Sequence, residues 1–114
     1  RLSAINDAMV AGAKRGDTQA MLAGNSEFHM TIYRASGSDL LVDLVELTWL
    51  RAGPLLNLAG GQSAMLRAAE QAHCKVLTAL HRRNPTAARA AIAQDINKAA
   101  EAFDRILTGE GGSP

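Results

Sequence analysis

The stretch HCKVLTALHRRNPTAARAAIAQD, residues 73–95, carries the signals that decide the fold. Apolar residues recur at helical spacing on both sides of Asn84-Pro85. An Asn side chain can cap a helix and Pro suits its first position, so this pair predicts a helix start. The only tight basic cluster, His81-Arg82-Arg83, stands just before it, as expected where cations meet the C-terminus of a preceding helix.

The same kind of punctuation extends outward over the whole chain. Gly16, Gly24 and Gly37 each follow a stretch with helical periodicity, and we expect each to end a helix. The connections are short, which predicts antiparallel neighbours. We therefore predict an all-α antiparallel bundle of about six helices within residues 1–108, followed by a flexible tail at 109–114. The expected helices cover residues 2–15, 17–23, 25–35, 39–52, 63–83 and 85–108.

Composition supports this fold and excludes several others. The 114 residues, about one domain, include 22 Ala and 14 Leu but only four aromatic residues. A hydrophobic share of 47% and a charged share of 20% exclude a disordered chain. The scarcity of aromatic residues argues against an all-β sandwich, and no apolar run is long enough to span a membrane. The net charge of +1 favours no class of partner, and the single cysteine, Cys74, indicates a reducing cytosol.

Four polar residues fall on helix faces that are otherwise apolar. Asn25 and His29 stand one turn apart, His73 lies within an inward stripe, and Asp95 lies between apolar residues of the last helix. Two imidazoles and a carboxylate suit a divalent transition metal, with the Asn25 oxygen as a fourth ligand. Two alternatives stay open: each histidine could be a hydrogen-bonded core residue, and Asp95 could pair with a Lys or Arg.

Other polar residues give weaker signals. Arg51 extends the stripe of the helix expected at 39–52, where its guanidinium could clamp a carboxylate or form a surface ion pair. We interpret Tyr33 and Trp49 as packing residues and Cys74 as a small core or near-surface hydrophobic residue, and we assign no role to His81. That stripe, which we expect to face inward, comprises Leu41, Leu44, Val45, Thr48 and Arg51.

Read together, these segments resemble the FCD ligand-binding domain, the C-terminal domain of FadR-subgroup, GntR-family bacterial transcription regulators. N-S-E-F-H at 25–29 is similar to its D-x-x-F-H motif, and A-S-G-S at 35–38 to its A-S-x-N turn. H-C-K-V-L-T-A-L at 73–80 is similar to H-x-x-I-L-x-A-I. Asn84 with the residues after it resembles D-x-x-x-A-x-x-x-M-x-x-H-L, through Ala88, Ile92, Asp95 and Ile96. The likeness runs from about Leu2 to Leu107.

The resemblance implies a metal set of Asp, His, His and His, and this chain departs from it at two positions. Asn25 stands in place of the Asp, and Asp95 stands in place of the last His. One carboxylate is thus kept, at a different corner of the site. The amide oxygen of Asn25 is a weaker ligand, and some family members bind their effector without metal.

The resemblance further implies a sensor rather than an enzyme. Such a domain binds a small organic acid, with a divalent metal such as zinc or nickel, and dimerises in the cytoplasm. It acts on DNA only through a winged helix-turn-helix domain, which we expect, with the first family helix, to lie outside this chain. The alternatives are a metal-free helical interaction module and a metalloenzyme with two His and one carboxylate.

Overall fold

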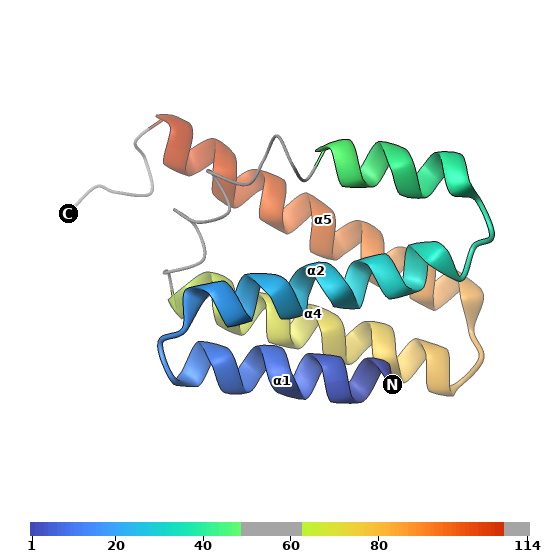
Figure 1. Ribbon diagram of the computed structural model, residues 1–114, viewed down its shortest axis with the longest axis horizontal. Coiled ribbons are helices and arrows are strands. Elements are labelled where there is room, and N and C mark those ends of the chain that lie inside the picture. Colours follow the sequence, from blue (N-terminus) through green and yellow to red (C-terminus); the bar gives the residue numbers. More distant parts are fainter. Residues whose placement is uncertain (49–62, 109–114) are drawn as a thin grey trace. The chain divides into compact units, whose positions relative to one another are not determined.

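The computed structural model describes residues 1–48 and 63–108, apart from the side chains of 63–66, 103, 106 and 107. Within these residues all regular structure is helical and there is no strand, so the all-α prediction is confirmed. The chain divides into two compact units, Arg1–Gly61 and Gln62–Pro114, whose helices are coloured blue to green and yellow to red in Figure 1. The N-terminal unit contains α1 (Leu2–Lys14), α2 (Thr18–Arg34) and a helical segment at 39–48; the C-terminal unit contains α4 (Ser63–His81) and α5 (Pro85–Thr108).

The turn between α1 and α2 is closed by backbone bonds and one side-chain cap. Gly16 has a φ of 75°, and the N–H of Asp17 donates to the carbonyl of Gly12 over 2.9 Å. This is the Schellman pattern, in which a left-handed residue, best supplied by Gly, ends a helix. The Oδ1 of Asp17 then accepts from the N–H of Ala20 at 3.0 Å and caps α2. The predicted helix end at Gly16 is confirmed.

The prediction that Gly24 ends a helix is wrong, because α2 runs unbroken through it. A Cβ added to Gly24 would lie 2.8 Å from the Cβ of Met9 and 2.9 Å from its Cα, so α1 passes directly over this position. Gly12 of α1 makes a similar approach, where a Cβ would lie 2.9 Å from that of Ala20. The glycine is therefore required by packing between helices rather than by a chain reversal, and the helices expected at 17–23 and 25–35 are one.

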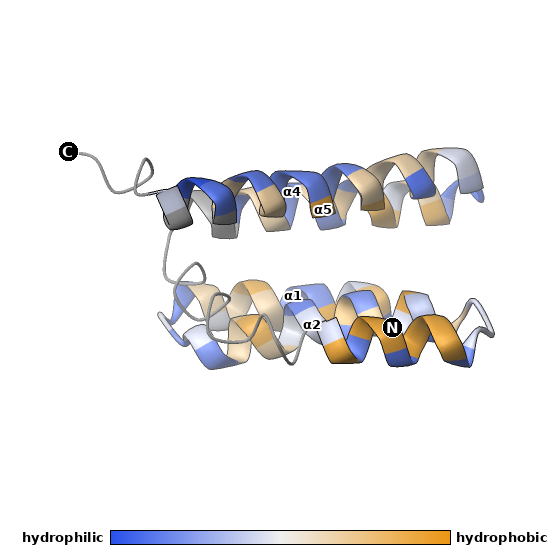
Figure 2. Cartoon of the chain, turned by 90° about the horizontal axis from the view of Figure 1, so that it is seen from above, coloured by the Kyte–Doolittle hydropathy of each residue, from blue (hydrophilic) through white to orange (hydrophobic). Residues whose placement is uncertain are grey.

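The described core of the N-terminal unit comes from α1 and α2. Each helix carries apolar and polar residues (Figure 2), as amphipathic helices do. The segment 39–48 contributes less than predicted, because Leu41 is 40% and Leu44 is 54% exposed. Among the described residues, its side-chain link to α2 is an ion pair between Arg34 and Glu46. The buried apolar side chains of α1 and α2 are those of Met9, Met21, Phe28 and Met30.

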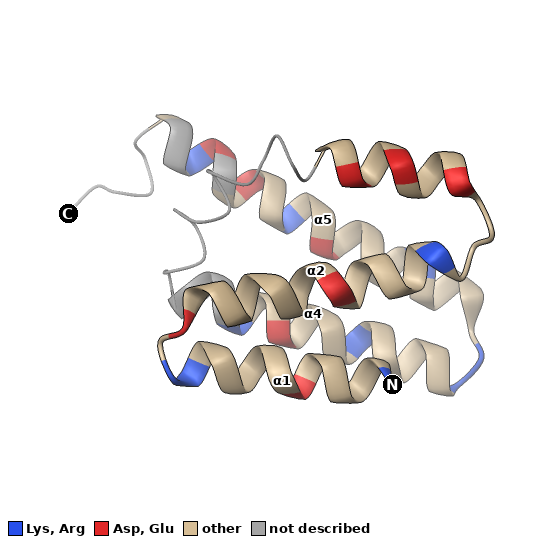
Figure 3. Cartoon of the chain, viewed as in Figure 1, with Lys and Arg blue, Asp and Glu red and all other residues tan. Residues whose placement is uncertain are grey.

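The C-terminal unit repeats the turn of the N-terminal unit with different residues. The N–H of Asn84 donates to the carbonyl of Ala79 over 2.9 Å, and Arg83 occupies the left-handed position with a φ of 53°. The Oδ1 of Asn84 accepts from the N–H of Ala87 at 3.0 Å. The predicted start at Asn84-Pro85 is thus confirmed, and the basic residues lie at the end of α4 and in the turn, as expected (Figure 3).

Candidate metal centre

The α4–α5 hairpin brings two of the four candidate ligands together. The Nε2 of His73 lies 3.4 Å from the Oδ2 of Asp95. His73 stands eleven residues before Asn84 and Asp95 eleven residues after it. In an antiparallel hairpin, residues equally far from the turn face each other, which explains the pairing. The pairing of His73 with Asp95 is therefore set by the position of the cap.

This pair is shielded from water. The side chain of His73 is fully buried and that of Asp95 is 13% exposed. A buried carboxylate is costly unless a partner compensates it, so its place on this face indicates a specific role. Val76, one turn along α4 from His73, is also buried, which places the pair beside an apolar interior.

The separation of the two atoms is informative about their chemistry. A charge-assisted N–H···O bond usually measures about 2.7–2.9 Å, so 3.4 Å is long for a direct bond between His73 and Asp95. Two ligand atoms held at about 2.1 Å by a tetrahedral zinc ion lie about 3.4 Å apart, because the angle between their bonds is about 109°. The pair therefore has the spacing of two metal ligands as well as the distance of a loose ion pair.

In α2, the third candidate, His29, is held by two neighbours on its own helix. His29 is buried, with 5% of its surface exposed. The ring of Phe28 meets it edge-on, with ring centroids 5.8 Å apart, and its Nδ1 lies 3.3 Å from the hydroxyl of Tyr33. Asn25, the fourth candidate, is half-buried one turn earlier on α2. His29 is thus buried and oriented, as its apolar stripe predicts.

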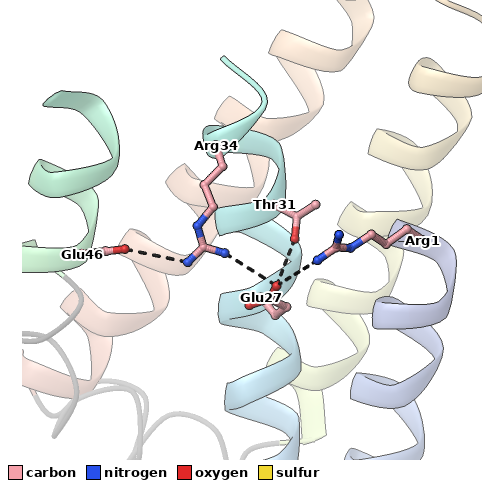
Figure 4. A network of polar contacts seen from close by, with 5 residues as sticks. All are labelled: Arg1, Glu27, Thr31, Arg34 and Glu46. Carbon is pink, nitrogen blue, oxygen red and sulfur yellow. Dashed lines mark hydrogen bonds and ion pairs between the residues drawn. The ribbon is translucent and has the colours of Figure 1, made fainter. Parts of the chain in front are cut away.

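Glu27, also on α2, is engaged elsewhere. Figure 4 shows one of its oxygens, Oε1, facing Arg1 at 3.8 Å, Arg34 at 3.7 Å and the hydroxyl of Thr31 at 3.3 Å. Arg34 continues to Glu46 at 3.8 Å. These charged side chains are 45–78% exposed, so each pair contributes little stability. The network joins the start of α1, α2 and the segment 39–48. It engages the carboxylate of Glu27, which lies close in sequence to His29.

The sequence interpretation missed two polar residues in this unit. Tyr33 was expected to serve packing, yet its hydroxyl contacts His29; a spacing of four residues along a helix is the signal that could have revealed this. Asn6 of α1 is 5% exposed, although its place three residues before Met9 could have indicated burial. The predicted effector residue, Arg51, lies outside the described residues. Cys74 is exposed, so it is not a core residue, and His81 is exposed at the end of α4.

Comparison with known protein families shows to which family the chain belongs. The FCD domain family matches residues 1–98. The chain is an FCD domain. FCD domains form the C-terminal part of GntR-family regulators, so the resemblance found in the sequence motifs is confirmed. No curated protein and no solved structure gives a significant match. Among the described residues, no helix is long and apolar enough to cross a membrane.

Proposed function

We propose that this FCD domain senses a small organic acid with the help of a divalent transition metal. The ligands are His29, His73 and Asp95, with Asn25 as a fourth. The observation that carries the proposal is the buried His73–Asp95 pair at 3.4 Å, which places an imidazole and a carboxylate at the spacing of metal ligands. FCD membership supports the addition of Asn25 and His29, because both lie in the matched range and in the motif for which the family resemblance implies ligands.

The residues present fit such a metal. Two imidazoles and one carboxylate could together hold an ion, and their donor types suit zinc or nickel better than magnesium or calcium. A bound divalent ion would supply a positive coordination point for the carboxylate of an organic acid. The residues of the chain orient the donors: the α4–α5 hairpin sets the spacing of His73 and Asp95, and Phe28 restrains the ring of His29.

In the proposed regulator the domain is a sensor and not an enzyme. It is a homodimer in the cytoplasm, and its effector alters DNA binding by a winged helix-turn-helix domain of the full-length protein. Such coupling requires that the effector binds one arrangement of the dimer more tightly than the other. Couplings of this kind amount to about 1–3 kcal/mol, enough to change operator affinity about 5- to 150-fold.

The test is metal uptake by the purified domain. After dialysis against zinc or nickel, we expect about one ion per chain by elemental analysis, on the basis of a single ligand set. His73→Ala should abolish uptake. His81→Ala is the matched control, because it removes an exposed histidine from the same helix and should leave uptake unchanged.

The outcomes separate the candidate functions. A wild-type domain that takes up no metal would overturn the metal part and favour the metal-free module, in which His73 and Asp95 serve as a loose ion pair. Given metal uptake, small mono- and dicarboxylic acids should raise the melting temperature only when the metal is present. A chelator that leaves such a response intact would place the acid at a site independent of the metal.

A further inference from the structure

Tyr33 lies beside His29 and is absent from the ligand set. Its hydroxyl is 3.3 Å from the Nδ1 of His29, and the two ring centroids are 5.9 Å apart with a tilt of 42° between the rings. The residues stand four apart on α2, so a single turn of a continuous helix fixes their contact. The contact lies wholly within α2 and is partly buried.

We propose that Tyr33 is a positioning residue that selects the tautomer of His29 for metal binding. The hydroxyl of Tyr33 accepts a hydrogen bond from Nδ1–H, and the lone pair that binds a metal is then on Nε2. The inference rests on the proposed metal function. It adds a residue that touches neither the metal nor the effector and acts through His29.

The physical reason is that the two nitrogens of a neutral imidazole have opposite roles. If Nδ1 carries the proton, Nε2 can donate its electron pair to a metal; if Nε2 carries it, that nitrogen cannot. Metal-binding histidines usually donate the other N–H to a second group, which fixes the ring and raises the basicity of the ligand. Phe28, whose ring meets His29 edge-on at an interplanar angle of 78°, restrains the ring but offers no acceptor for this proton.

Removing the hydroxyl alone tests this role. Tyr33→Phe keeps the aromatic ring, and we expect it to weaken zinc or cobalt affinity by about 10- to 100-fold, the usual effect of losing such a partner. Thr31→Val is the matched control, because it also removes a part-buried hydroxyl of α2, one bonded to Glu27 at 3.3 Å. That variant should bind the metal as the wild type does.

A second measurement needs no metal. The ¹⁵N chemical shifts of the His29 ring report which nitrogen carries the proton. In the metal-free wild type we expect the Nδ1–H form, and in Tyr33→Phe a shift towards the Nε2–H form, with unchanged helix content by circular dichroism. A purely structural role for Tyr33 would lower stability without moving this tautomer ratio.

The two measurements keep this inference separate from the proposed function. A wild type that binds no metal contradicts the metal function, and the ¹⁵N shifts still decide whether Tyr33 sets the tautomer. If the wild type binds metal and Tyr33→Phe shows the same metal affinity and the same ¹⁵N shifts, the role of Tyr33 is overturned while the metal function stands. An Nε2–H form in the wild type would overturn it directly.

Discussion

The α1–α2 and α4–α5 hairpins have the same local design and different interiors. Both close on a Schellman turn followed by a capping side chain, that of Asp17 in one and Asn84 in the other. Between α1 and α2, Gly12 and Gly24 allow the helix backbones to approach closely. Between α4 and α5 the chain places the buried His73–Asp95 pair instead.

The comparison indicates how stability and function are divided between the hairpins. The first gains stability from the close approach of its helices at Gly12 and Gly24, and it also buries the polar Asn6 and His29. The second buries a carboxylate and an imidazole, which lowers its stability unless they are compensated. Polar groups that weaken a hairpin interior are expected where binding of a ligand supplies the compensation. The α4–α5 hairpin, whose interior holds the His73–Asp95 pair, should therefore be more stable with metal than without it.

The largest expected effect is the loss of metal stabilisation in Asp95→Asn. With free metal at about 100 times its dissociation constant, the wild-type free energy of unfolding should rise by about 2.7 kcal/mol. In Asp95→Asn most of this gain should vanish, because an amide is a poor transition-metal ligand. In chelator the variant should stay within about 1 kcal/mol of the wild type, since Asn keeps the shape and leaves no isolated charge beside His73.

Denaturant unfolding with and without metal measures both quantities. Asp104→Asn, at an exposed position of α5, is the matched control and should retain the full gain. If Asp95→Asn were stabilised by metal as strongly as the wild type, the division between the hairpins would be wrong, because Asp95 would then serve only the apo fold.

A second, smaller effect should appear in the packed hairpin. Gly24→Ala inserts a methyl group 2.8 Å from the Cβ of Met9, closer than real Cβ atoms approach. Overpacking costs about 1–3 kcal/mol, and the better helix propensity of Ala returns at most about 1 kcal/mol. We expect a net loss of about 1–2 kcal/mol in urea unfolding.

The neighbouring residue supplies the control for Gly24. Ala23→Ser also adds one atom, at an exposed position of the same helix, and should change stability by no more than about 0.5 kcal/mol. A Gly24→Ala variant as stable as the wild type would contradict this prediction, because α1 and α2 could then separate without losing packing energy.

Gly24 also shows where sequence reasoning reached its limit. Local signals sufficed at Gly16 and Asn84, because a helix end depends on backbone angles and caps supplied by neighbouring residues. They failed at Gly24, because its role depends on Met9, fifteen residues away along the chain. Periodicity placed His29 and His73 on inward faces, and both are buried. It could not assign the hydroxyl of Tyr33 to His29, since the same spacing also fits packing alone.

The smallest effect concerns the left-handed position of each turn, which is a glycine in the first hairpin and an arginine in the second. Gly16 and Arg83 hold the same left-handed position, with φ of 75° and 53°. Such a conformation costs a residue with a side chain about 1 kcal/mol or more, and Gly avoids this cost. Gly also makes the unfolded chain more flexible, which lowers stability by about 0.4–1 kcal/mol and offsets part of this gain. Arg83→Gly should therefore stabilise the domain by about 0.5 kcal/mol net.

Two control variants separate the backbone effect from the loss of charge. Arg83→Ala removes the guanidinium but keeps a Cβ, so it should show no gain in thermal unfolding. Gly16→Ala should lose about 1 kcal/mol, and because a Cβ there meets no atom within 4 Å, that loss measures the backbone conformation alone. Equal stabilities of Arg83→Gly and Arg83→Ala would mean that the strain at Arg83 is no larger than the entropy cost of Gly, about 0.4–1 kcal/mol, and would contradict the expected gain.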